Sequence, residues 1–554
     1  MKHSAMMDRS GLTPYRKFGY IPGDLESESV SKTLEYAYDD WCIAQMALAL
    51  GHTSDYEEYL QRAQSYQNVF DPSTSFMRGK ENGCWVTPFD PRSVTVHYTE
   101  ANAWQYSFFV PHDITGLVRD MGGDKGFSAK LDSLFYSSSA LAGRQQADIS
   151  GLIGQYAQGN EPSHHVAYLY DYVGEPWKTE EILRVIMDSL YTPSPGGLCG
   201  NDDCGQMSAW YVLSALGFYQ VCPGKPEYSI GLPLFPKIIV HTGNGKPFII
   251  ESTSQGNRAR YIQSAILNGH PFTKSYLTHT QITAGGRLRF FLGDSPSESW
   301  GKKPGDYPVT SVPETIVPVP FFSSETRSFT DSLEVSLSSP MPGTKIYYTN
   351  DSSEPSQRSL LYDHPVMIHE SKAFRAVAIR ENGKTSDIAE AAFLRNLTRI
   401  KIKLLTPYSD QYTGGGTNAL VDGLKGGPDF RLGAWQGYEQ VDLDALIDLE
   451  KTDTLLSVSL GCLQDVNAWI FFPQYVEYSF STDGIHFMDT IRTVNGVSQH
   501  DENPQVQRFS KVLTRLPARY IHIRATNIGT CPPWHRGAGG KAWLFADECE
   551  VTTK

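Results

Sequence analysis

The apolar positions in the first 220 residues recur with the spacing of α-helices. Between residues 56 and 70 the spacing is carried by Tyr56, Tyr59, Leu60, Ala63, Tyr66 and Phe70. An apolar stretch at residues 31–50 ends at Gly51, so the two segments are predicted to form a helical hairpin. Further helices are expected near residues 101–121, 126–136, 140–158, 163–173, 178–191 and 205–217. Successive helices joined by short links indicate stacked helical hairpins.

The pattern changes from helical to strand-like after Tyr228. Short β-rich runs separated by Gly and Asn turns stand at residues 236–241, 247–251 and 287–292. We therefore assign residues 1–300 to a helical domain with a β-rich end. The Pro- and Gly-containing residues 301–317 are typical of a linker. Alternating strands and turns then predict a small β-sandwich at 318–396 and a second β unit at 397–554.

Composition narrows the classes of function. The net charge of −13 and the lack of a Lys/Arg cluster argue against a nucleic-acid partner. No run of about 18 apolar residues exists, so no insertion into a membrane is expected. The first residues also lack the apolar stretch of a signal peptide. Eight cysteines are too few for a disulfide scaffold in 554 residues, although one or two disulfides fit this composition.

Glu100 lies in the aromatic- and amide-rich segment 98–106, where the pattern changes from strand-like to helical. Aromatic neighbours remove water from a carboxyl group and raise its pKa, which suits a general acid. Acidic residues also favour the first turn of a helix, so Glu100 is equally well interpreted as a helix cap. The residues of this segment leave both interpretations open.

A second acidic segment, residues 197–205, places Asp202 and Asp203 among glycines before an apolar helix. Glycines let a backbone approach a ligand closely, but adjacent acids ahead of a helix are also ordinary capping residues. Local spacing alone favours capping here. Two carboxylates from separate loops are nevertheless the equipment that an inverting glycoside hydrolase needs, one as acid and one as base.

A third segment, residues 159–165, offers possible metal ligands. Asn160 and Glu161 supply the hard oxygen donors that calcium takes, whereas His164 and His165 would suit zinc. Two adjacent histidines on a helix cannot point the same way. We therefore favour a hard cation, or no metal, over zinc.

Together the segments 98–106, 159–165 and 200–217 resemble glycoside hydrolase family 92 over about residues 10–300. The resemblance implies a calcium-dependent, inverting exo-α-mannosidase on an (α/α)6 toroid, acting on mannose-containing glycans. By motif, Glu100 would be the general acid and Asp203 the general base, or Asp202 if the register differs by one residue. The resemblance further implies metal ligands and sugar contacts. The implied calcium ligands are Asn160 and Glu161, and the implied substrate-binding residues are Trp104, Gln105, Asn201 and Asp202.

The sequence also departs from the family pattern. Members carry a β-sandwich before the toroid, and the toroid needs about twelve helices, whereas about eight are expected here. The chain is thus expected to start inside the catalytic domain, as part of an (α/α)6 toroid, and to have little mannosidase activity alone. The alternative function is a remnant that binds carbohydrate without hydrolysing it.

The downstream β units resemble modules of carbohydrate-active enzymes. Residues 318–396 are similar to the small, Ig-like C-terminal sandwich of chitobiases and hexosaminidases, and 397–554 to the discoidin-like jelly roll of factor 5/8 type C domains. The second resemblance implies sugar binding at the loops of one end and a structural calcium held by Asp422 and Glu548. Trp469, Phe471 and Phe472 lie in an apolar run and are predicted to be core. Such modules and calcium use imply a periplasmic or extracellular location.

Overall fold

The computed structural model describes residues 1–254, 259–313, 316–396 and 400–554, and these form two compact units. Unit 1 comprises residues 1–21, 28–79 and 86–318, and unit 2 comprises 22–27, 80–85 and 319–554. The predicted boundary between residues 396 and 397 falls beside 397–399, outside the described residues. Each unit is described by itself below.

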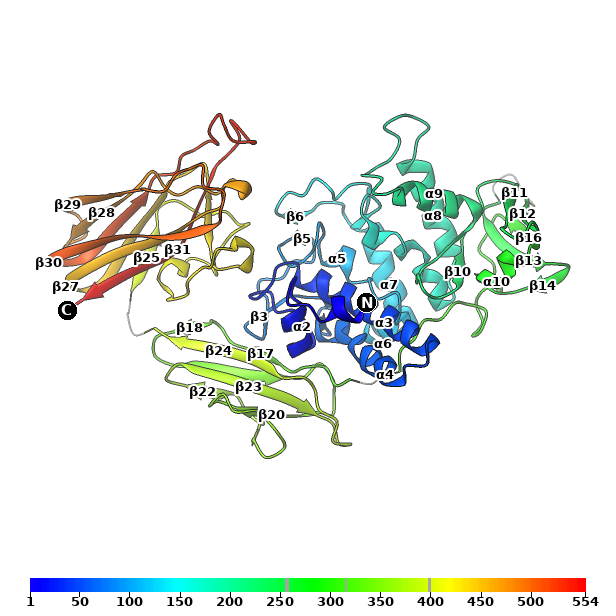
Figure 1. The fold of residues 1–554 in the computed structure, drawn as a ribbon, viewed down its shortest axis with the longest axis horizontal. Helices are drawn as coiled ribbons and strands as arrows, with labels where there is room; N and C mark the ends of the chain where they lie inside the picture. The colour runs from blue at the N-terminus through cyan, green and yellow to red at the C-terminus, as the bar shows by residue number, and fades with distance from the viewer. Residues whose placement is uncertain (255–258, 314–315, 397–399) are drawn as a thin grey trace. The chain divides into compact units, whose positions relative to one another are not determined.

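Unit 1 begins with the predicted helical hairpin. α3 (Ser29–Ala49) and α4 (Thr53–Arg62) are joined at Gly51, whose φ of +76° suits a residue without Cβ. Trp41 and Ala44 of α3 pack against Tyr59 of α4 in one buried cluster. The hairpin, whose helices α3 and α4 are labelled in Figure 1, is thus held by the apolar faces that the spacing indicated.

The remaining longer helices of unit 1 lie in the same helical body, whereas the short α10 lies beside the β-rich end (Figure 1). The longer ones are α2 (Leu12–Phe18), α6 (Ile114–Asp120), α7 (Gly123–Tyr136), α8 (Pro176–Leu190) and α9 (Gln206–Leu216). The short ones are α1 (Lys2–Ala5), α5 (Ala103–Tyr106), α10 (His279–Thr283), η1 (Ser65–Asn68), η2 (Glu161–Ser163) and η3 (Val166–Val173). The helices predicted at 126–136, 178–191 and 205–217 are confirmed within three residues by α7, α8 and α9.

Two of the predicted helices are wrong. Residues 140–158 form loops and the short strands β6 (Ala142–Gly143), β7 (Leu152–Ile153) and β8 (Tyr156–Ala157), because Gly143, Gly151 and Gly154 have positive φ angles. The helix expected at 101–121 divides into α5 and α6. Pro111 cannot continue α5, and the Asp113 carboxylate starts α6 by accepting a hydrogen bond from Gly116 N at 3.1 Å.

The β-rich end of unit 1 is a five-stranded sheet in the order β11-β12-β16-β13-β14. β12 and β16 run parallel, and the other neighbours run antiparallel. Phe248, Ile250, Leu288 and Phe290 form part of its buried core. The strands of unit 1 not yet bounded are β1 (Phe70–Asp71), β2 (Phe76–Met77), β5 (Ser93–Val94), β9 (Phe218–Tyr219), β10 (Glu227–Ile230), β11 (Lys237–His241), β12 (Pro247–Ser254), β13 (Tyr261–Leu267), β14 (His270–Phe272), β15 (Tyr276–Thr278) and β16 (Gly286–Gly293).

The segment expected to be a linker, residues 301–317, is bonded to the helical body where the structure describes it. Thr310 Oγ1 accepts a hydrogen bond from Ile114 N at 3.0 Å, and Val312 N donates to the Asp113 carboxylate at 3.1 Å. Residues 314 and 315 of this segment lie outside the described residues. The start of α6 is therefore completed by a segment about 200 residues away in sequence.

Unit 2 begins with the small sandwich, whose two sheets have the orders β22-β19-β17-β4-β3 and β18-β24-β23-β20-β21. Val335 and Phe374 lie in the buried core between them. Strands β3 and β4 come from residues before 86. The sandwich therefore includes two strands from the sequence that was assigned to the first domain. The strands are β3 (Lys80–Glu81), β4 (Cys84–Trp85), β17 (Phe321–Ser323), β18 (Ser328–Phe329), β19 (Leu333–Ser338), β20 (Lys345–Thr349), β21 (Leu360–Leu361), β22 (Val366–Ile368), β23 (Lys372–Ile379) and β24 (Ala389–Arg395).

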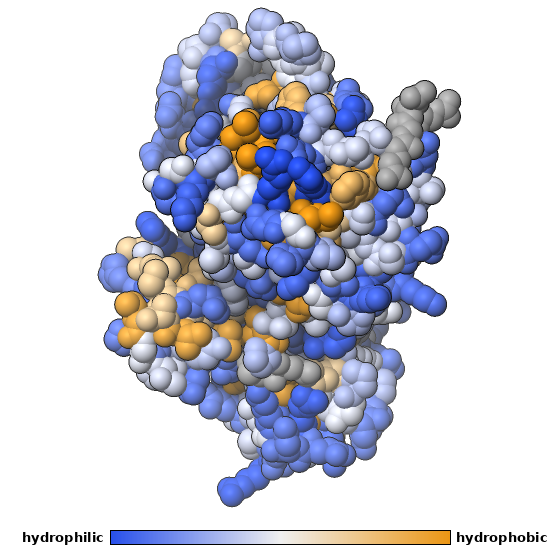
Figure 2. Space-filling model, turned by 90° about the vertical axis from the view of Figure 1, so that its right-hand side faces the viewer, coloured by the Kyte–Doolittle hydropathy of each residue, from blue (hydrophilic) through white to orange (hydrophobic). Residues whose placement is uncertain are grey.

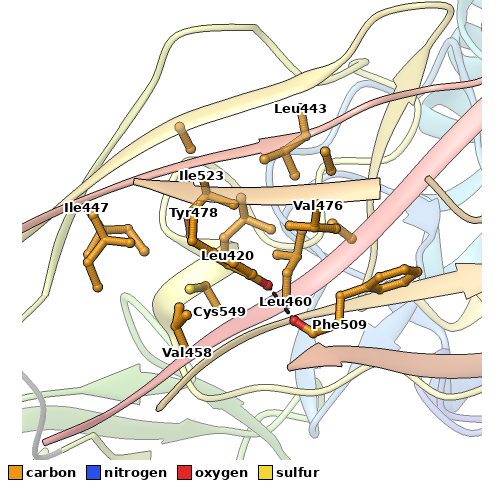
Figure 3. Close-up of a cluster of buried hydrophobic side chains, with 14 of the residues drawn as sticks. Leu420, Leu443, Ile447, Val458, Leu460, Val476, Tyr478, Phe509, Ile523 and Cys549 are labelled. Carbon is orange, nitrogen blue, oxygen red and sulfur yellow. Dashed lines mark hydrogen bonds between the residues drawn. The ribbon is translucent and has the colours of Figure 1, made fainter. Parts of the chain in front are cut away.

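The C-terminal β unit has the strand order β26-β31-β27-β30-β28-β29, with β25 paired to β27. Register shifts at 448/453 and 455/457 interrupt the long β27, where bulges let a strand bend. Tyr478 lies in the buried cluster, and its hydroxyl donates to the Phe509 carbonyl at 2.6 Å (Figure 3). The elements are β25 (Lys401–Leu404), β26 (Gln436–Glu439), β27 (Leu443–Gln464), β28 (Tyr475–Ser481), β29 (Met488–Val494), β30 (Gln505–Ala525), β31 (Trp543–Thr553), η4 (Ala419–Val421), η5 (Phe430–Leu432) and η6 (Val466–Ala468).

The apolar run at 469–472 divides between core and surface. Phe471 and Phe472 are buried, as predicted, but the prediction for Trp469 is wrong because 37% of it is exposed. A Cβ on Gly537 would lie 2.5 Å from the Trp469 ring, and one on Gly540 would lie 2.9 Å from it. The ring therefore rests on backbone that only glycine provides.

The molecular surface is mainly polar on the face shown in Figure 2, with apolar residues in smaller groups. In the part of the chain that the structure describes, no helix is both long and apolar enough to cross a membrane.

Asp171 of η3 is a buried acid, and its protonation should make the folding stability depend on pH. It is fully buried, and neither carboxyl oxygen accepts a hydrogen bond within the described residues. Burial raises the pKa of this carboxyl well above the usual range, and the nearby Thr179 offsets only part of the rise. The folded state thus keeps the proton while the unfolded chain releases it near pH 4, so folding stability falls as the pH rises from there.

Replacing Asp171 with Asn should therefore raise the melting temperature at pH 7–8 and flatten its decline between pH 5 and 8. One removed unit of pKa shift corresponds to about 1.4 kcal/mol. Thermal unfolding across this pH range measures the effect, with the exposed Asp188→Asn as control. A loss of stability that is the same at every pH would contradict the expectation.

Candidate functional site

Glu100 is free of the capping role that the sequence left open. Asn102 caps α5 instead, because its Oδ1 accepts from Gln105 N at 3.2 Å while Gln105 Oε1 accepts from Asn102 N at 3.1 Å. The Glu100 carboxyl is partly exposed and makes no hydrogen bond within the described residues. Its φ of +47° is uncommon for a residue with a side chain. Such strain clusters at functional sites, which favours the functional interpretation.

The two predicted sugar contacts of this segment lie in structural surroundings. Gln105 is buried, with Nε2 donating to Gln155 O at 3.2 Å, so both ends of its amide are bonded within the protein. Trp104 packs edge-on against Phe76 at 4.6 Å, and Lys130 Nζ lies 4.9 Å from its ring. These contacts favour a structural role for Gln105, while the partly exposed Trp104 keeps both interpretations.

The carboxylates of Asp202 and Asp203 have different surroundings in the structure. The Asp202 carboxylate accepts from Ser208 N at 2.9 Å and from Ser208 Oγ at 3.0 Å, so it satisfies the start of α9. Asp203 is exposed, with a φ of +35° and a side chain that bonds to no other described residue. Capping thus accounts for Asp202 and leaves the Asp203 carboxylate available for chemistry.

The three motifs converge in unit 1. Asn160 Nδ2 donates to the Glu100 carbonyl at 3.1 Å, which joins the first motif to the third. His164 Nδ1 is bonded to Gln206 Nε2 at 3.1 Å, and Trp210 Nε1 donates to His164 O at 2.8 Å, which joins the third to the second. Segments about 100 residues apart in the sequence therefore meet in one region of unit 1.

Glycines allow the loops of this site to approach closely. A Cβ on Gly200 would lie 2.6 Å from Gly159 Cα, and one on Gly159 would lie 2.1 Å from Ser150 Oγ. Gly151 is similarly close to Cys199, at 2.6 Å from its Sγ. Any larger residue at these positions would push the loops apart, which gives the motif glycines a physical role.

The electrostatics of the site are acidic. The pKa of Glu100 is raised, first by burial and then by the negative charges of Asp148, Glu161, Asp203 and Glu28, in that order. A raised pKa keeps a carboxyl protonated toward neutral pH, as a general acid requires. Asp148 was missed by the sequence, because it belongs to none of the three motifs and lies in the segment expected to be helical.

The residues expected to hold a metal fit a hard cation better than zinc. Asn160 uses Nδ2 as a donor, which leaves Oδ1 as an acceptor, and the Glu161 carboxylate bonds to no other described side chain. Burial lowers the pKa of both His164 and His165 to about 4, and their Nε2 atoms contact the carbonyls of Gln158 and Phe108 at 3.0 Å.

The imidazole rings of His164 and His165 thus have structural roles. No group of three or more His, Cys, Asp or Glu side chains among the described residues is arranged to hold a metal. Calcium at this site would therefore need amide, water or substrate oxygens beside Glu161.

In unit 2, Asp422 and Glu548 lie close enough that the charge of Asp422 adds to the effect of burial on Glu548. Burial raises the pKa of Asp422 to about 6 and that of Glu548 to about 8. Glu548 Oε2 accepts from Gly423 N at 2.9 Å. A structural calcium at this pair stays a prediction.

A cavity of about 530 Å³ occurs elsewhere in unit 1. Its polar lining includes Arg9, Asp39, Asp40 and Arg62, and no predicted site residue borders it. The catalytic assignment therefore rests on the converging loops and not on this cavity.

Known proteins with similar sequences and structures were found for both parts of the chain. Residues 1–294 match the model of the glycosyl hydrolase family 92 catalytic domain, and 335–393 match the Fn3-associated family. An uncharacterized secreted glycosidase of Arthroderma benhamiae is 30% identical over 336 residues, covering 54% of this chain and 41% of that protein. The chain thus spans about two fifths of the curated relative's length.

Two solved structures from Bacteroides thetaiotaomicron resemble the helical part. A family 92 α-mannosidase is 42% identical, with a TM-score of 0.52, covering 57% of this chain and 41% of that one; it has also been solved in complex with mannoimidazole. A family 92 inverting mannosidase is 41% identical, with a TM-score of 0.50, covering 55% and 42%.

These matches confirm the predicted fold class, part of an (α/α)6 toroid followed by β-sandwich domains. The family model covers more than half of the chain and includes all three converging motifs. The chain belongs to glycoside hydrolase family 92.

Proposed function

We propose that this chain carries the acid and base of an inverting exo-α-mannosidase, with Glu100 as general acid and Asp203 as general base. The observation that carries the proposal is that both carboxyls escape capping roles while their motifs converge. Asn102 and Asp202 take the capping roles that the local sequence had left to Glu100 and Asp203.

The proposed reaction is a single displacement at the anomeric carbon. Asp203 removes a proton from water as the water oxygen bonds to that carbon, and Glu100 gives its proton to the departing glycosidic oxygen as the old bond breaks. Asp203 ends protonated and Glu100 ionised, and the α-linkage yields a β-mannose product. The raised pKa of Glu100 supports its assignment as the group that starts protonated.

The substrate class is proposed from the relatives. Two are named mannosidases, one of them in complex with mannoimidazole, so we infer mannose-containing glycans. We further propose terminal α-1,2-linked mannose as the preferred substrate, a linkage that the names of these relatives do not specify. The secreted relative favours a periplasmic or extracellular location. Calcium bound near Asn160 and Glu161 would hold mannose hydroxyls and favour the flattened ring of the transition state.

Two measurements on this chain decide between an enzyme and a binding remnant. The first follows mannose release from α-1,2-mannobiose by NMR with and without a chelator, and the second titrates calcium by calorimetry. Chelator-sensitive release with β-mannose appearing first supports the enzyme. Calcium binding without release supports the remnant, and α-mannose appearing first would contradict inversion.

The C-terminal β unit supports a second, non-catalytic function. We propose that it binds carbohydrate through Trp469 and Trp534, which are 37% and 41% exposed. The Trp534 ring stacks on His500 with centroids 4.0 Å apart, and buried His535 contacts both Trp rings edge-on. Trp469 is held at a φ of +65°, uncommon for a bulky residue. Exposed, rigid aromatic rings suit stacking on sugar faces.

Replacing Trp534 with Ala should weaken binding to yeast mannan at least tenfold, which corresponds to about 1.4 kcal/mol. The reason is the lost apolar ring face, since the residue lies outside the packed core. Affinity electrophoresis on mannan gels measures the effect, and Tyr136→Ala removes an even more exposed aromatic residue from unit 1 as control. Equal retardation of both variants and the parent chain would exclude this platform for mannan.

A further inference from the structure

Asp148 lies in the loop between β6 and β7 and uses both carboxylate oxygens. Gln146 Nε2 donates to Oδ2 at 2.8 Å, and Asn201 Nδ2 donates to Oδ1 at 3.2 Å. Both donors are neutral amides, and no ion pair of Asp148 occurs within the ranges that the structure describes. The second bond ties this loop to Asn201, 53 residues further along the chain, in the segment that also carries Asp203.

The segment around Asp203 needs outside support. Three successive residues, Asp203, Cys204 and Gly205, have positive φ angles of +35°, +58° and +88°. Two of them carry side chains, for which this backbone region is unfavourable by about 1–2 kcal/mol each. Such a backbone persists only when contacts around it hold it in place.

Contacts on both sides of Asp203 hold the segment. On the α9 side, the Asp202 carboxylate is bonded to Ser208. On the side that precedes Asp203 in the sequence, Gly200 packs on Gly159, and the Asn201 side chain donates a hydrogen bond to Asp148. Asp148 therefore anchors the Asp203 segment at a residue only two positions before the proposed base.

We propose that Asp148 is a positioning residue, which holds the Asn201 amide and thereby directs the Asp203 carboxylate toward Glu100. The proposal rests on the proposed function, because it assigns Asp148 a role through Asp203 and not through contact with the sugar. A misplaced base lowers the rate of the chemical step more than it lowers substrate affinity, because positioning contributes mainly in the transition state.

The kinetic test compares Asp148→Ala and Asp148→Asn on an aryl α-mannoside. The Ala variant should lower kcat about 10- to 100-fold, as loss of a supporting contact does at other sites, with KM within about threefold. Asn keeps an acceptor oxygen for Asn201 and should restore most of the rate. An Ala variant with unchanged kcat, or with a loss confined to KM, would overturn the proposal.

Coupling between Asp148 and Asn201 provides an independent check. If they act as one contact, the Asp148→Ala/Asn201→Ala double variant should be no slower than the slower single variant. Losses that multiply would show separate roles. Asp188→Ala, which removes an exposed carboxylate paired with Arg184 at 2.7 Å, is the matched control for the loss of an acid.

Hydrogen exchange separates this proposal from the proposed function. In the Asp148→Ala variant, peptides that cover residues 199–205 should exchange faster, while peptides from the β11–β16 sheet and the Asp188→Ala control stay unchanged. This readout needs no turnover. If the parent chain releases no mannose, this chain is a binding remnant and the enzymatic function fails for it, whereas unchanged exchange at 199–205 would overturn the positioning role separately.

Discussion

Replacing Glu100 with Gln is expected to lower the turnover of natural α-mannosides about 10²- to 10⁴-fold. Gln cannot donate a proton to the departing oxygen, and general acid catalysis contributes a factor of this size. The substitution should leave the fold intact, because the Glu100 carboxyl makes no hydrogen bond within the described residues and α5 is capped by Asn102. Rates of mannose release measure the effect against the parent chain.

The leaving group distinguishes an acid from a structural residue. A dinitrophenyl leaving group departs without a proton, so Glu100→Gln should lose much less activity on dinitrophenyl α-mannoside than on mannobiose. Asn102→Ala is the control for a structural loss, because it removes the cap of α5 and the bond to Gln155 Oε1 and so lowers stability without removing a proton donor for the leaving group. Equal losses on both substrates would argue against Glu100 as the acid.

Local patterns predicted the regular elements well where apolar spacing governs them. α3, α4, α7, α8 and α9 follow from periodicity and end at residues that disfavour helix, such as Gly51 and Gly217. The helix predicted at residues 140–158 is wrong because glycines there adopt positive φ angles, which the periodicity of apolar residues does not reveal. Residues 301–317 likewise resembled a linker, although Thr310 and Val312 complete the start of α6.

The proposed site was indicated by the motifs and not by local chemistry, and its residue roles stay predictions. Whether Glu100 or Asn102 capped α5 depended on a shift of two residues, and the choice between Asp202 and Asp203 depended on a shift of one. Asp148 could not be found, because its partner Asn201 lies 53 residues away and only the fold brings them together. The contribution of β3 and β4 to the small sandwich was hidden for the same reason.

Asp203→Asn is expected to have the second large effect and to decide which acid is the base. An amide cannot take the proton from water, so turnover should fall about 10²- to 10⁴-fold. Unlike the loss at Glu100, this loss should be as large on dinitrophenyl α-mannoside as on mannobiose, because water must be activated whatever group leaves. Steady-state rates on the two substrates measure it.

Asp202→Asn is the matched comparison from the same loop. The Asp202 carboxylate holds Ser208 at the start of α9, and Asn keeps an oxygen that can accept from Ser208 N, so this substitution should cost little stability and only a modest part of the rate. The opposite result, a large rate loss for Asp202→Asn and a small one for Asp203→Asn, would move the base to Asp202. The assignment would then need the α9 start to release Asp202 during catalysis, because both oxygens of this carboxylate accept hydrogen bonds from Ser208.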